Sequence, residues 1–190
     1  DVVLQGVIDY AARLAAHCER EAAACSDPDR AAELAEMAVN LRQVPAGPAR
    51  TYWQALQSVW LLHMIFHATM NGNAIGRLDQ FAWPYLRDDL AAGRLDLERA
   101  AELTDCFCLK FNERAAATEE LRPENREAED LDPLARTRHY TSSQIAGRRD
   151  RLDATNHWLQ NVVVGGLTPE GEDGTNPLTY LLLESYRRHQ

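Results

Sequence analysis

Several features are scarce in this 190-residue sequence, and each scarcity argues against a class of protein. It has no run of eighteen apolar residues, so we expect no membrane-spanning helix. Lys110 is the only lysine, and 29 acidic residues outnumber 20 basic ones, which argues against a nucleic-acid-binding protein. Four cysteines are too few for a disulfide scaffold. Because Asp1 is not followed by a basic and apolar leader, we expect a cytoplasmic protein.

The apolar residues that are present follow a helical pattern over most of the chain. Hydrophobic residues make up 45% of the sequence, which is enough for a packed core. Asp27, Asp96 and Asn176 are typical helix caps, and Thr51 with Gln54 forms a capping-box pattern. These signals predict helices over residues 3–24, 28–43, 51–70, 77–92, 96–111 and 177–190.

Two segments break the helical pattern. Residues 117–136 are rich in charge and poor in apolar anchors, which predicts a charged surface loop. The clearest strand lies near 158–166, where a β-branched run ends in Gly165 and Gly166. No partner strand is evident in the sequence. A lone strand with uncovered edges predicts a fragment of a larger α/β protein. We also expect the isolated chain to expose apolar surface.

Local motifs do not assign a reaction. His63 and His67 lie four residues apart on one helix face, but Met64 stands where a metalloprotease needs glutamate, so we expect no metal site. Cys106 and Cys108 are two residues apart on a helix and point to nearly opposite sides. We expect all four cysteines to be small buried hydrophobic residues.

Five segments, taken in order, carry a resemblance. They are residues 44–57 (VPAGPARTYWQALQ), 76–85 (GRLDQFAWPY), 106–113 (CFCLKFNE), 160–166 (QNVVVGG) and 173–181 (DGTNPLTYL). The series resembles the pyruvate formate-lyase domain of glycyl radical enzymes. The GRLDQ segment is similar to the diol dehydratase, amine-lyase and decarboxylase branches. The match covers nearly the whole chain from about Tyr10.

The resemblance implies a fold and an activity. Residues 1–190 would be part of a single pyruvate formate-lyase-like domain, and the fold would be α/β, a mostly helical fragment of a ten-stranded α/β barrel. The whole enzyme would cleave a carbon–carbon or carbon–heteroatom bond of a small molecule by radical chemistry under anaerobic conditions. It would bind no separate cofactor but carry a glycyl radical, installed by a radical S-adenosylmethionine activating enzyme. It would be a homodimer.

The resemblance also separates residues that contact substrate from those that do not. The family's thiyl cysteine follows the Val-Gly-Gly strand and its radical glycine lies in an Arg-Val-x-Gly-Tyr-like motif. Neither feature is in this chain, so the chain alone is expected to be inactive. The residues expected to line the substrate pocket are Trp158 and Gln160, or Asn161 if the register is reversed, with His157 near the mouth and Ser143. A packed strand with a core tryptophan is the alternative.

Arg77, Asp79 and Gln80 are expected to form a structural polar cluster of hydrogen bonds and ion pairs, not a catalytic one. Two other functions remain open at this point. The chain could be a non-catalytic helical interaction module, or a degraded pseudo-enzyme fragment.

Overall fold

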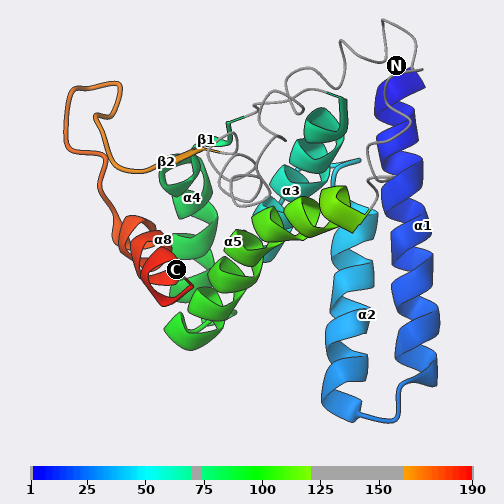
Figure 1. Ribbon diagram of the computed structural model, residues 1–190. Helices are drawn as coiled ribbons and strands as arrows, with labels where there is room; N and C mark the ends of the chain where they lie inside the picture. Colours follow the sequence, from blue (N-terminus) through cyan, green and yellow to red (C-terminus); the bar gives the residue numbers. More distant parts are fainter. Residues whose placement is uncertain (1, 70–73, 121–160, 190) are drawn as a thin grey trace, which may run out of the picture.

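The computed structural model describes residues 2–69, 74–120 and 161–189. These residues form mostly helices and a small sheet (Figure 1). The elements, in chain order, are α1 (Val2–Ala24), α2 (Pro28–Gln43), α3 (Tyr52–Thr69), β1 (Gly76–Arg77), α4 (Leu78–Ala91), α5 (Leu97–Glu120), β2 (Val162–Val163) and α8 (Pro177–Arg188). No described helix is long and apolar enough to cross a membrane.

Helices α1 and α2 form an antiparallel hairpin that extends away from the other helices (Figure 1). The Asp27 side chain accepts hydrogen bonds from the amides of Asp29 and Arg30, so the predicted cap is confirmed. Small residues such as Ala11, Ala15 and Ala38 are buried between the two helices. Because alanine side chains are short, the helices can approach closely along this seam.

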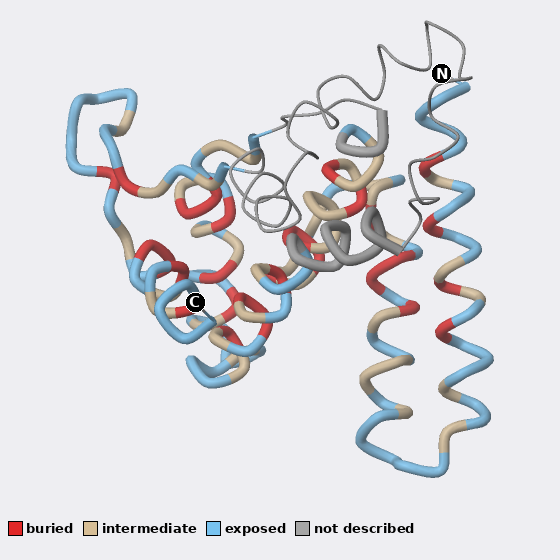
Figure 2. Tube along the Cα trace, in the orientation of Figure 1, coloured by how far each residue is buried: buried red, intermediate tan, exposed pale blue. Residues whose placement is uncertain are grey.

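The larger core lies where α3, α4, α5 and α8 meet, and Figure 2 shows the buried residues gathered there. Tyr52 anchors the start of α3 in this core. Its amide donates to the Asp89 carboxylate at 2.7 Å, and its hydroxyl lies 2.9 Å from the Thr104 hydroxyl. Burial raises the pKa of the Tyr52 phenol, so Tyr52 stays neutral. The core therefore contains polar groups with specific partners.

The predicted strand has a partner, and the expectation of a lone strand is wrong. β1 and β2 pair in parallel, with Gly76 opposite Val162 and Arg77 opposite Val163. The two residues of β1 directly precede α4 and are too few to show an alternating pattern, which is why the sequence did not reveal them. Of the predicted strand near 158–166, residues 158–160 lie outside the described residues.

The charged loop predicted for residues 117–136 begins too early. Helix α5 continues to Glu120, so residues 117–120 are helical. Alanine and glutamate are strong helix formers, and residues 115–120 (AAATEE) are rich in both, which explains the extension. Residues 121–136 lie outside the described residues.

Candidate functional site

The loop that follows β2 begins with two glycines in the left-handed conformation. Gly165 has a φ of +67° and Gly166 a φ of +85°. Residues other than glycine rarely adopt these φ values, because their Cβ atoms collide with the backbone. The Gly166 carbonyl then accepts a hydrogen bond from the Gly174 amide at 2.7 Å. The two glycines thus turn the chain sharply at the end of the strand.

Asp79 lies in the first turn of α4 and is fully buried. Its Oδ2 accepts hydrogen bonds from the Gly165 amide at 2.6 Å and from the Thr179 hydroxyl at 2.5 Å. The N-terminal end of α4 favours a negative charge at this position. Oδ1 of Asp79 has no hydrogen-bond partner among the described residues. One carboxylate oxygen therefore joins three segments of the chain.

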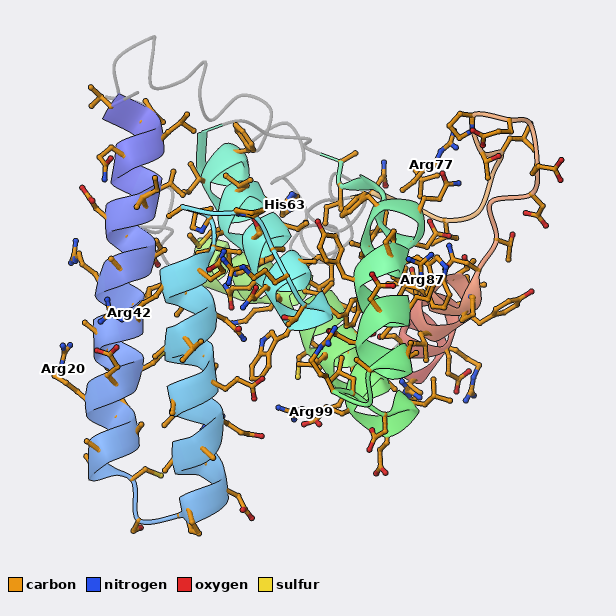
Figure 3. All side chains as sticks on the ribbon, turned by 180° about the vertical axis from the view of Figure 1, so that it is seen from behind. Arg20, Arg42, His63, Arg77, Arg87 and Arg99 are labelled. Atoms are coloured by element: carbon orange, nitrogen blue, oxygen red, sulfur yellow. The ribbon has the colours of Figure 1, made fainter. Side chains whose placement is uncertain are left out.

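Gln80 and Arg77 bind the same loop from either side of Asp79. The Gln80 side chain donates to the Gly165 carbonyl at 2.7 Å. The Arg77 guanidinium donates to the Leu167 carbonyl at 2.6 Å (Figure 3). We call Arg77, Asp79, Gln80, Gly165 and Gly166 the double-glycine junction. All three polar side chains therefore bind the segment that follows β2.

Asn176 attaches the start of α8 to the same place. Its Oδ1 accepts from the Leu178 amide at 3.0 Å, which confirms the predicted cap. Its Nδ2 donates to the Asp79 backbone carbonyl at 3.0 Å. The side chain therefore caps one helix while it holds the first turn of another, and α8 lies beside α4 (Figure 1).

The two faces of β2 have different surroundings. Val162 and Val164 are partly buried against the main core. Asn161 is exposed, and Val163 is 48% exposed. The Asn161 carbonyl accepts from the Ile75 amide at 3.0 Å, which extends the pairing of the strands by one residue. Among the described residues, helices cover only the face of β2 that carries Val162 and Val164.

The predicted pocket residues are described only in part. Ser143, His157, Trp158 and Gln160 lie outside the described residues, whereas Asn161 is exposed beside β2. No sequence signal indicates the part that Thr179 plays, and the sequence indicates Asn176 only as a cap. The DGTNP segment was visible, but its contacts with Asp79 span about a hundred positions and need the folded chain.

The other candidate residues do not gather into a site. Within the described residues, no group of three or more histidine, cysteine, aspartate and glutamate side chains could hold a metal ion. His63 is buried, and its ring centroid lies 6.1 Å from that of Trp60. Cys18 is buried, but Cys106 is exposed, so the expectation of four buried cysteines is wrong. Cys106 lies at a groove between helices and not in the core.

This groove of about 290 Å³ lies between α2, α3 and α5. Trp53, Trp60 and Phe107 are among its lining residues, and the Arg99 guanidinium lies 5.2 Å from the Trp53 ring centroid (Figure 3). Although Cys106 is exposed, partial desolvation of its thiol beside this groove raises the pKa of the thiol. None of the lining residues belongs to the double-glycine junction.

Comparisons with known proteins place this arrangement in context. A family model described as pyruvate formate lyase-like matches residues 1–190. Isethionate sulfite-lyase of Bilophila wadsworthia is 34% identical over 189 residues, which are 98% of this chain and 20% of that protein. Trans-4-hydroxy-L-proline dehydratase of Clostridioides difficile is 29% identical over 144 residues, which are 74% of this chain and 15% of that protein.

Solved structures agree with the sequence matches. A protein of 1,2-propanediol dehydration in Roseburia inulinivorans superposes with a TM-score of 0.71 at 29% identity, over 96% of this chain and 20% of the other. A glycyl radical enzyme from Archaeoglobus fulgidus gives a TM-score of 0.69 at 29% identity, over 97% of this chain and 20% of that protein. The chain therefore spans about a fifth of the length of the proteins that it matches.

Proposed function

We propose that this chain, which belongs to the pyruvate formate lyase-like family, builds part of the wall of a substrate cavity. The whole protein would be a glycyl radical lyase or dehydratase. The observation that carries the proposal is the asymmetry of β2. One face of the strand rests on helices, and the other is uncovered by the described residues. In an α/β barrel, helices lie outside the strands, and the opposite strand face looks into the barrel.

The whole protein would cleave a carbon–carbon or carbon–heteroatom bond of a small molecule under anaerobic conditions. Its relatives include a sulfite-lyase and a hydroxyproline dehydratase, which supports a lyase or dehydratase activity. We further propose a cytoplasmic homodimer that is activated by a radical S-adenosylmethionine enzyme. The β1–β2 pair would be part of the ten-stranded barrel.

The exposure of Asn161 bears on which side chains line the cavity. Side chains alternate along a strand, so Asn161 shares its face with Val163, on the side opposite to Val162. If the strand begins before Asn161, the same alternation would group His157 with Asn161, and Trp158 with Gln160. We therefore propose Asn161, with His157, as the cavity-lining pair in preference to Trp158 and Gln160. Ser143 remains a proposal of the family resemblance alone.

The radical chemistry would be supplied from outside this chain. Cys106 and Cys108 lie on helix α5, and partial desolvation raises the pKa of both thiols. Neither is on a loop after the Val-Gly-Gly strand, so we propose that neither forms the thiyl. The described residues would then enclose and position the substrate while excluding water. The chain alone would be inactive.

The full-length protein tests this proposal directly. It is expressed anaerobically with a radical S-adenosylmethionine activating enzyme, and the glycyl radical is measured by electron paramagnetic resonance. Turnover is then measured with isethionate, 1,2-propanediol, glycerol, trans-4-hydroxy-L-proline and indoleacetate. We expect a glycyl radical and turnover of at least one compound.

Asn161→Ala separates the cavity role from radical formation. We expect it to lower kcat/KM while the radical content stays the same, and Glu170→Gln in the exposed loop serves as the matched control. Absence of an organic radical, under conditions in which a known relative is activated, would reject the enzymatic function. That outcome would favour the interaction-module alternative.

A further inference from the structure

We propose that Asp79 is a positioning residue that fixes β2, and with it the cavity-facing side chains of that strand, through its hydrogen bonds to Gly165 and Thr179. This inference rests on the proposed function, since it concerns the same cavity. Asp79 would do more than stabilise the fold, because it would set the position of side chains that face the cavity. Among the described residues, no hydrogen bond joins Asp79 to Asn161, so Asp79 would act through the strand.

The contacts at the two ends of β2 support this role. At one end the Ile75 amide bonds to the Asn161 carbonyl at 3.0 Å. At the other end the Gly165 amide bonds to Asp79 at 2.6 Å. Both partners belong to the short segment that runs from Ile75 through β1 into α4. The strand is therefore held at each end by one continuous piece of chain 86 residues away.

Adjacent side chains of α4 hold both polar groups of Gly165. Asp79 accepts from its amide, and Gln80 donates to its carbonyl at 2.7 Å. Two bonds from consecutive residues fix both the position and the orientation of this glycine. Because Asp79 is fully buried, no water from bulk solvent replaces a lost bond at low cost. The junction thus resists a shift of the strand along its axis.

The two oxygens of Asp79 have different surroundings, and this makes the role testable. Oδ2 makes both side-chain hydrogen bonds, whereas Oδ1 has no partner among the described residues. An asparagine at position 79 can place its carbonyl oxygen at Oδ2 and its amide nitrogen at Oδ1. Asp79→Asn therefore keeps the hydrogen bonds and removes the charge. Asp79→Leu removes the hydrogen bonds and the charge, and replaces the aspartate with a side chain of similar size.

A displacement of β2 would move the side chains that are proposed to face the cavity. Asn161 and Val163 lie four and two residues before Gly165, in the short segment that contains β2. A misplacement of about 1 Å in a positioning group can lower the rate by about 100-fold. Loss of the Asp79 bonds should therefore lower catalysis without any change at a side chain that touches substrate.

The experiment uses the full-length enzyme and a second buried aspartate of α4 as its control. Asp89 is 1% exposed and accepts from the Tyr52 amide, but it does not contact the double-glycine junction. Asp89→Leu therefore reproduces the loss of a buried carboxylate without releasing β2. The measurements are glycyl-radical content, kcat/KM for isethionate or the first compound of the panel that wild type converts, and hydrogen exchange of peptides covering residues 161–167.

We expect Asp79→Leu to lower kcat/KM by about 100-fold at unchanged radical content, and to speed exchange over 161–167. Asp79→Asn should stay within about threefold of wild type, because the hydrogen bonds are kept. Asp89→Leu should leave both readouts near wild type. Unchanged kinetics in Asp79→Leu would overturn the proposal. Equal damage from Asp79→Asn would overturn it too, since the charge would then be the requirement.

Gln80→Leu keeps the proposal falsifiable if Asp79→Leu does not fold. It removes the second bond to Gly165 and should also lower kcat/KM and speed exchange over 161–167, and no change in either would count against the positioning role. Failure of the proposed function gives a different result, because wild type would then form no radical. The exchange measurements on the same variants would still decide whether Asp79 fixes the strand.

Discussion

Gly174 has no side chain, and the Gln80 side chain occupies the space beside it at the double-glycine junction. A Cβ at this position would overlap Gln80 Nε2 and would lie 3.1 Å from the Gly166 carbonyl oxygen. Gly174→Ala should displace Gln80 from the Gly165 carbonyl and lower the free energy of unfolding by about 1–3 kcal/mol. Urea unfolding of the full-length protein measures the change.

Gly6 supplies the matched control for this substitution. It lies in α1, and a Cβ there would meet nothing within 4 Å. Gly6→Ala should raise the free energy of unfolding by about 0.5–1 kcal/mol, because alanine loses less backbone freedom in a helix. Equal free energies of unfolding for the Gly174→Ala variant and wild type would show that the position of Gln80 at the junction does not contribute to stability.

Asp105 and Arg188 join α5 to the end of α8 at a distance of 2.8 Å. Partial burial is the largest single influence and acts to raise the pKa of Asp105, but Arg188, Ser185 and His189 together lower it by more, so the pKa lies below its ordinary value. A lowered pKa in the folded state stabilises the protein at neutral pH. This contribution is lost as the pH falls through the folded-state pKa.

Asp105→Asn should therefore lower the free energy of unfolding by about 0.2–1 kcal/mol at pH 7. The difference from wild type should shrink as the pH is lowered below about 4, where the wild-type carboxylate becomes protonated. Unfolding curves over this pH range provide the measurement, with Glu170→Gln as control. A difference that grows at acid pH would contradict the assigned direction of the pKa.

At the scale of elements, Asn176 connects the start of α8 to the start of α4. Asn176→Ala removes both the cap and the donor to the Asp79 carbonyl, and should cost about 1–2 kcal/mol of unfolding free energy. Asn176→Asp keeps the cap acceptor but not the donor, so it should cost less. Denaturant unfolding of both variants tests the order, and equal losses would show that the cap acceptor contributes nothing beyond the donated bond.

Elements with strong local signals could be predicted from the sequence. Asp27 and Asn176 cap helices as expected, because a cap is formed by neighbouring residues. β1 could not be predicted, since two residues show no period and their partner lies far along the chain. The grouping of Arg77, Asp79 and Gln80 was visible in the sequence. Their contacts with the glycine loop depend on tertiary structure, and sequence spacing does not encode them.

At the scale of the whole molecule, large apolar side chains remain exposed on and beside α8. Tyr180 is 64% exposed, Leu183 53% and Tyr186 70%. Because the chain spans about a fifth of its relatives' length, we expect the remainder of the protein to cover this face. Hydroxyl-radical footprinting should label Tyr180 and Tyr186 in the 190-residue chain and protect them in the full-length protein. Equal labelling in both would show that this face stays in solvent.

A crystal structure of the full-length protein under anaerobic conditions is the most direct test of the claim that this chain forms part of a cavity wall. We expect β1 and β2 to continue into a larger parallel sheet. Asn161 and Val163 should face an enclosed cavity, and Asp79 should hold Gly165 as described here. A second layer of helices packed over Asn161 and Val163 would contradict it.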